Sequence, residues 1–98
     1  MTERTLRQKA AKMCKKYGFK YWFAPRVKFC TSQDIFNAFD MILLPYDKKP
    51  YFIQLTTFSH KETRRKKIAV LFKKYPLPER SYIWAYHNST RKFVEIKL

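Results

Sequence analysis

The chain has 98 residues, of which 46% are hydrophobic and 18% aromatic. This composition excludes a disordered tail, and the length is sufficient for one domain with a modest core. We therefore predict a single domain over residues 1–98. No apolar run approaches the ~18 residues that a membrane span requires, and the N-terminus lacks a signal-peptide core. These features predict a soluble, cytoplasmic protein that does not enter a membrane.

The charge balance is strongly basic. Lys and Arg number 22 against 7 Asp and Glu, which gives a net charge of +15. A surplus of this size on a small domain favours a polyanionic partner, DNA first and RNA as an alternative. The other readings are a generic basic surface, or a patch for acidic proteins or anionic lipid. Charge alone indicates neither sequence specificity nor catalysis.

Residues 2–17 have the pattern of an amphipathic helix, with Thr2 as N-cap and Gly18 ending it in a left-handed turn. Its apolar residues recur at the i, i+4, i+7, i+8, i+11 spacing of one buried stripe. They are Leu6, Ala10, Met13, Cys14 and Tyr17. Cys14 and Cys30 lack metal-ligand spacing, so we predict two buried free thiols.

The aromatic segment 19–29 predicts a strand. Trp22 and Phe23 lie among basic residues there, and two readings of them stay open. Such rings stack on nucleic-acid bases when they are exposed, and they belong to the core when they are buried.

Two apolar runs flank a turn centred on Asp47 and predict a hairpin of two largely buried strands. The runs are Met41–Leu44 and Tyr51–Leu55. If the hairpin is symmetric about Asp47, Asp40 lies opposite Gln54, with side chains roughly 5 Å apart. Thr56 is two residues further and shares that face. Because a buried carboxylate needs a cation or hydrogen-bond donors, this polar trio is the candidate site.

A second helix is predicted over Lys61–Tyr75, with Ser59 and Glu62 in the form of a capping box. Its expected buried stripe is Ile68, Leu71, Phe72 and Tyr75. Two further strands are predicted over Ser81–Tyr86 and Lys92–Leu98.

A continuous basic run lies in the first half of this helix: Arg64, Arg65, Lys66 and Lys67. Consecutive residues point around the whole helix. We therefore expect at least one of the four to face inward toward Gln54 and Thr56, and the others to face solvent or phosphate.

The order of elements, with an acid at the start of the hairpin and a polar pair at i, i+2 on its second strand, resembles the PD-(D/E)xK nuclease superfamily. Within it, the archaeal and phage Holliday-junction resolvases are the most similar group. The matching residues are Glu3, Phe39–Leu43 and Phe52–Thr56. The resemblance implies an α/β (α+β) fold with a restriction-endonuclease-like αβββαββ core, a central mixed sheet flanked by helices. It also suggests a homodimer that places two sites on one DNA junction.

The resemblance further implies hydrolysis of phosphodiester bonds with Mg²⁺ or Mn²⁺. By that analogy Asp40 is the central metal ligand, and Gln54 takes the place usually held by Asp or Glu. The carbonyl of Leu55 is a further ligand, and Glu3 joins through water. This oxygen set suits a hard cation, although an amide oxygen brings no charge.

The sequence departs from the family at Thr56, where a Lys normally orients the attacking water. A cation from Lys61, Arg64 or Arg65 would preserve that chemistry. The catalytic candidates are therefore Asp40, Gln54, Thr56 and Lys61. The nucleic-acid-binding candidates are Arg4, Arg7, Arg64, Arg65, Lys66 and Lys67.

Three functions follow from these patterns. The favoured one is a metal-dependent deoxyribonuclease (an endonuclease) acting on branched, single-stranded or duplex DNA. The alternative is a nuclease fold that binds nucleic acid without cutting it. The third is a small basic interaction or packaging protein of a different fold, in which Asp40 and Gln54 lie far apart.

Overall fold

The computed structural model describes residues 2–24, 38–73 and 76–98. The elements are α1 (Glu3–Tyr17), β1 (Lys20–Phe23), β2 (Met41–Leu44), β3 (Tyr51–Thr57), the short 3₁₀ helix η1 (Phe58–His60), α2 (Lys61–Leu71), β4 (Ser81–His87) and β5 (Lys92–Lys97). The predicted α+β class is confirmed, and the four later strands have approximately the expected bounds. The first is shorter than predicted, since β1 ends at Phe23; residues 25–29 of that prediction, and Cys30, lie outside the described residues.

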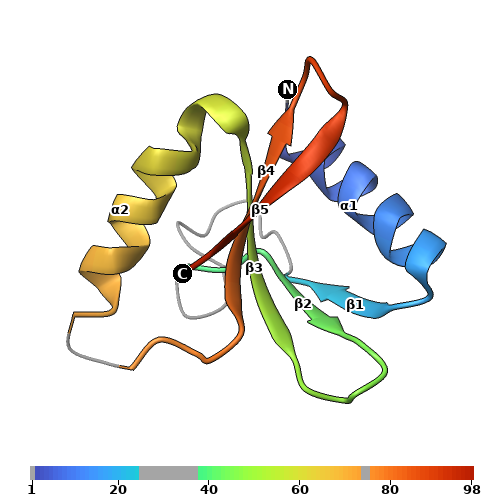
Figure 1. Cartoon of the computed structure of the whole chain (residues 1–98), viewed down its shortest axis with the longest axis horizontal. Helices are drawn as coiled ribbons and strands as arrows, with labels where there is room; N and C mark the ends of the chain where they lie inside the picture. Colours follow the sequence, from blue (N-terminus) through green and yellow to red (C-terminus); the bar gives the residue numbers. More distant parts are fainter. Residues whose placement is uncertain (1, 25–37, 74–75) are drawn as a thin grey trace.

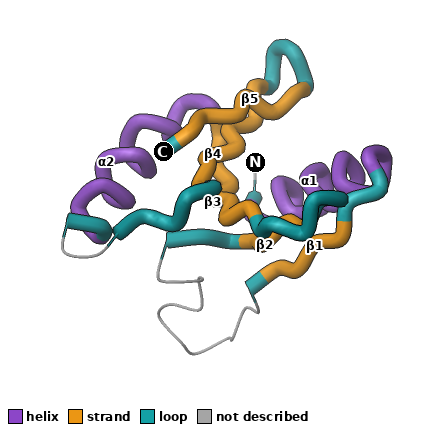
Figure 2. The backbone as a smooth tube through the Cα atoms, turned by 60° about the horizontal axis from the view of Figure 1, so that its bottom comes forward, coloured by secondary structure: helices purple, strands orange, loops and turns teal. Residues whose placement is uncertain are grey.

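The five strands form one mixed sheet in the order β1-β2-β3-β4-β5. Neighbouring strands are antiparallel except β3 and β4, which are parallel. A parallel pair requires a long crossover connection, and α2 lies in this one. Figure 1 shows the sheet between α1 and α2, and the rotated view in Figure 2 keeps the two helices apart.

Helix α1 follows the sequence prediction closely. The Thr2 side chain accepts a hydrogen bond from the Thr5 amide, and Gly18 ends the helix with φ 73°. The positive φ of this left-handed turn is the reason that glycine is favoured here. The prediction for Tyr17 is wrong. Its side chain is 55% exposed, because it lies in the last turn and stacks on Phe19 at the edge of the core.

Helix α2 begins at the predicted residue, but its N-terminal cap and its last residue differ from the prediction. It begins at Lys61 after η1, and no side-chain hydrogen bond caps it. The predicted capping box is wrong because Ser59 lies within η1, where the chain is already turning, and Glu62 contacts Lys61 and Arg65 instead. The helix ends at Leu71, before the expected residue.

The predicted stripe of α2 is only partly confirmed. Ile68 is buried at 3% exposure and Phe72 is half-buried, whereas Leu71 is 37% exposed. The fourth member, Tyr75, lies outside the described residues.

Each face of the sheet has its own hydrophobic cluster. The cluster under α1 contains Leu6, Ala10, Cys14, Met41, Leu43, Ile53, Leu55, Trp84 and Tyr86. The cluster under α2 contains Ala38, Phe39, Ile68, Ile83 and Ala85. Cys14 is a buried free thiol as predicted, and burial raises its pKa to about 11.

Candidate functional site

The polar trio forms where strand β2 begins. Strands β2 and β3 pair Met41 with Ile53 and Ile42 with Phe52, so the same register places Asp40 opposite Gln54. The Gln54 Nε2 atom donates to Asp40 Oδ2 at 2.8 Å. The predicted juxtaposition is therefore confirmed, and the two side chains do not lie far apart as the third reading expects.

Asp40 is buried, with 3% exposure, and its carboxylate accepts hydrogen bonds from N–H groups. Besides Gln54, the backbone amide of Leu55 donates to the same Oδ2 atom at 2.8 Å. Gln54 Nε2 also donates to the Leu55 carbonyl at 3.0 Å. These bonds offset the cost of burying the carboxylate, because each N–H replaces a water lost from it.

This arrangement permits a test of the implied metal site. Two oxygens expected to bind the cation, Asp40 Oδ2 and the Leu55 carbonyl, both receive hydrogen bonds from Gln54 Nε2. The amide N–H₂ group therefore occupies the space where a shared ion would bind, and its hydrogens carry positive partial charge.

The donor chemistry points the same way. Mg²⁺ prefers octahedral oxygen ligands at about 2.0–2.1 Å, including one or two carboxylates. Within residues 2–24, 38–73 and 76–98, no cluster of three or more His, Cys, Asp or Glu side chains is placed to hold a metal. In this orientation of the amide, Gln54 presents N–H groups rather than its oxygen to Asp40 Oδ2 and to the Leu55 carbonyl.

Glu3 and Arg7 are connected to Asp40 through the end of β1. Arg7 Nη1 donates to the Ala24 carbonyl at 2.7 Å, and the Ala24 amide donates to the Asp40 carbonyl at 2.8 Å. Glu3 Oε1 lies 3.4 Å from Arg7 Nη2. The Arg7 side chain is only 15% exposed. Arg7, predicted to bind phosphate, therefore braces α1 against β1.

The other two catalytic candidates lie in different surroundings. Thr56 is buried, with 4% exposure, on the same side of β3 as Gln54. Lys61 places its ammonium 4.6 Å from the centroid of the Phe58 ring and 3.9 Å from Glu62 Oε1. At the start of α2, the Lys61 ammonium therefore forms an ion pair with Glu62 and a cation–π contact with Phe58.

The basic run of α2 is exposed at all four positions: Arg64, Arg65, Lys66 and Lys67. The prediction that one of them faces inward is wrong. The helix packs through Ile68, with Phe58 and Phe72 beside it, so its preceding turn contributes no buried side chain. Arg4 on α1 is exposed as well.

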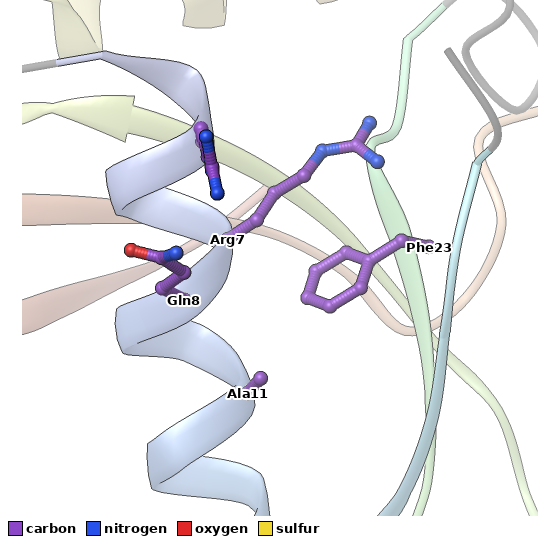
Figure 3. Close-up of a pocket in the computed structure, with 5 residues that line it drawn as sticks. Arg7, Gln8, Ala11 and Phe23 are labelled. Carbon is purple, nitrogen blue, oxygen red and sulfur yellow. The ribbon is translucent and has the colours of Figure 1, made fainter.

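Sequence reasoning missed a groove between α1 and β1. Its volume is about 510 Å³, and it is lined by Arg4, Arg7, Gln8, Ala11 and Phe23 (Figure 3). The four helical residues lie at i, i+3, i+4 and i+7, which places them on one stripe of α1. That spacing was the available signal, but the strand opposite it is only identified by the fold.

The structure separates the two aromatic residues of β1 that the sequence left open. Phe23 is partly buried against the α1 cluster, whereas Trp22 is 53% exposed. Alternation along the strand explains this difference, because successive side chains point to opposite faces.

No family model, curated protein or solved structure matches the chain. In the described ranges, neither helix is long and apolar enough to cross a membrane. Its function is therefore inferred from the chain's own residues.

Proposed function

We propose that the chain is a DNA-binding protein that binds the phosphate backbone through α2. The observation that supports this best is the exposure of Arg64, Arg65, Lys66 and Lys67 on a helix in which only Ile68 is buried. Adjacent cations repel one another, and phosphates relieve that repulsion while releasing condensed counterions. The net charge of +15 favours the same partner.

We further propose that the fold is a restriction-endonuclease-like αβββαββ core. Two observations support this assignment. The order of elements is a helix, three strands, a helix and two strands. The side chains of Asp40 and Gln54 also meet at the start of the hairpin. The proposed partner is DNA, with RNA as an alternative, and the proposed assembly is a homodimer.

Between binding and cutting, the geometry favours binding without metal-dependent cleavage. The reason is the position of Gln54 Nε2, which donates to both Asp40 and Leu55. Cleavage is the second candidate, because the same two oxygens converge on one point. A carboxylate in place of the Gln54 amide would turn that point into an oxygen-lined site.

The binding proposal is tested by fluorescence anisotropy with a labelled duplex over a range of salt concentrations. Replacing Arg64, Arg65, Lys66 and Lys67 by Gln is expected to weaken binding and to reduce the log–log salt slope by up to roughly 3–4, about 0.9 for each phosphate that is no longer neutralised. The control removes four other exposed cations, Lys48, Lys49, Lys92 and Lys97, by the same change. Both variants have the same net charge. Equal losses of affinity in the two variants would refute a specific role of α2.

The choice between binding and cutting is tested with Mn²⁺ on a panel of duplex, single-stranded, flapped and four-way DNA. We expect wild type to bind these DNAs and leave them intact. Calorimetric titration with Mn²⁺ alone is expected to detect no saturable site in wild type and a gain of binding in Gln54→Glu. Cleavage by wild type that disappears in Asp40→Ala would establish the second candidate instead.

A further inference from the structure

The groove between α1 and β1 has the size and lining of a ligand site. Its volume of about 510 Å³ lies within the roughly 300–1,000 Å³ typical of small-molecule sites. Figure 3 shows Arg7 reaching from α1 toward β1, with the Phe23 ring facing the helix and Ala11 about one turn along from Arg7.

The groove is lined mainly by apolar atoms. The Phe23 ring forms one side, and the small Ala11 side chain leaves room beside it. The Arg7 guanidinium carbon lies 5.3 Å from the centroid of that ring. Its Nη1 bond to the Ala24 carbonyl holds the guanidinium in place. A ring and a fixed guanidinium plane form a surface on which a planar aromatic ligand stacks.

Two polar residues, Arg4 and Gln8, line this mainly apolar groove, and both are exposed to solvent. A guanidinium donates two parallel hydrogen bonds to a phosphate, and a carboxamide both donates and accepts. The groove thus combines an apolar surface for stacking, a group that reads polar edges, and a cation. This combination matches a nucleobase with its phosphate.

We propose that this groove binds one unpaired nucleotide of single-stranded or branched DNA. The base stacks beside Phe23, Gln8 bonds to its edge, and Arg4 binds the adjacent phosphate. Bases inside a regular duplex are covered by their neighbours, so only an unpaired base that is turned out enters such a groove. This inference rests on the proposed DNA-binding function and narrows its substrate class.

The location of the groove connects it to the candidate site. Arg7 lines the groove and donates to the Ala24 carbonyl, and the Ala24 amide donates to the Asp40 carbonyl. On the opposite face of β1, the exposed Trp22 ring adds a second stacking surface. A DNA strand that crosses the edge of the sheet at β1 would meet an aromatic ring on each face of the sheet.

The test compares three probes with the same number of phosphates in each strand. They are an oligothymidylate, the same oligomer with abasic sites, and a duplex. We expect wild type to bind the oligothymidylate at least fivefold more tightly than the abasic oligomer, because one stacked base contributes about 1–3 kcal/mol. Gln8→Ala and Ala11→Leu are expected to reduce that ratio by removing the edge contact and filling the groove. Arg65→Gln is the matched control, and it should weaken all three probes by a similar factor.

The outcomes separate this inference from the function on which it rests. Binding of all three probes with equal affinity, or a ratio that Ala11→Leu leaves unchanged, would overturn the groove assignment and leave DNA binding by α2 intact. A wild-type protein that binds none of the probes at low salt would overturn both. Circular dichroism of each variant confirms that a changed ratio does not arise from unfolding.

Discussion

The two helices cover the sheet to different extents. Helix α1 buries Leu6, Ala10 and Cys14 and is capped at both ends, whereas α2 buries only Ile68 and has no side-chain cap. Leu6 on α1 and Ile68 on α2 each contribute roughly 1.5–3 kcal/mol, and the smaller Ala10 and Cys14 side chains add to the attachment of α1. The comparison indicates that α1 stabilises the fold, while α2 presents charge at the surface.

The largest expected effect tests the depth of packing directly. Leu6→Ala, on the buried face of α1, is expected to lower the free energy of unfolding by about 3 kcal/mol, because it removes buried methyl groups and leaves a cavity. The matched change Val70→Ala on α2, where the side chain is 66% exposed, should stay within about 0.5 kcal/mol. Urea unfolding measures both. Similar losses of stability at the two positions would contradict the comparison.

The Cys14 thiol gives a chemical measure of the same face. Burial raises its pKa from near 9 to about 11, so the thiolate fraction at pH 8 falls by roughly 100-fold. In a Cys30→Ser background, alkylation by iodoacetamide should be slower by about that factor in the native protein than in urea. Because the unfolded thiol ionises first, stability should also fall as the pH rises above about 9. Equal rates in the two states would show that α1 opens readily.

The polar trio is the next test. Asp40→Ala is expected to cost about 2 kcal/mol, because the Leu55 amide and the Gln54 side chain lose their charged acceptor inside the fold. The control, Asp47→Ala, removes a carboxylate from the exposed hairpin turn and should cost less. Thermal and urea unfolding distinguish the two variants. No loss of stability in Asp40→Ala would mean that this carboxylate does not hold the trio together.

The N-terminal caps of the two helices are expected to differ in their contribution to stability, by a smaller amount. Thr2→Ala removes the side-chain bond to the Thr5 amide and is expected to cost about 1 kcal/mol. Ser59→Ala should change stability by only a few tenths of a kcal/mol, since Ser59 lies in η1 and makes no cap bond to α2. A destabilisation at Ser59 equal to that at Thr2 would restore the capping box that the sequence suggested.

The smallest effect lies outside both helices. Hydrogen bonding to Arg80, at 2.7 Å, lowers the pKa of Asp47. A carboxylate with a lowered folded pKa stabilises the protein above its unfolded pKa, near 3.9, and this contribution is lost as the pH falls through the folded value. Wild type should therefore lose slightly more stability below pH 4 than Asp47→Asn. Unfolding curves between pH 2 and 6 measure the difference.

Local patterns predicted α1, the hairpin and its register well. Alternation of apolar residues and the symmetric turn were sufficient to place Asp40 opposite Gln54, because pairing in a short hairpin is decided by neighbouring residues. The prediction of a capping box at Ser59 was wrong because local sequence alone did not decide the conformation there. The sequence around Ser59 is equally compatible with a 3₁₀ turn, and the path from β3 into α2 decides between them.

The sequence by itself determined the basic charge, the α+β class and the residues that meet at the start of β2. Only the tertiary structure decided that Gln54 donates to both Asp40 and Leu55, and that all four cations of the run Arg64–Lys67 face solvent. It also brought Phe23 of β1 against the α1 stripe to form the groove. The physical reason is range: periodicity and capping act over a few residues, whereas donor direction and exposure depend on segments that are distant in the chain.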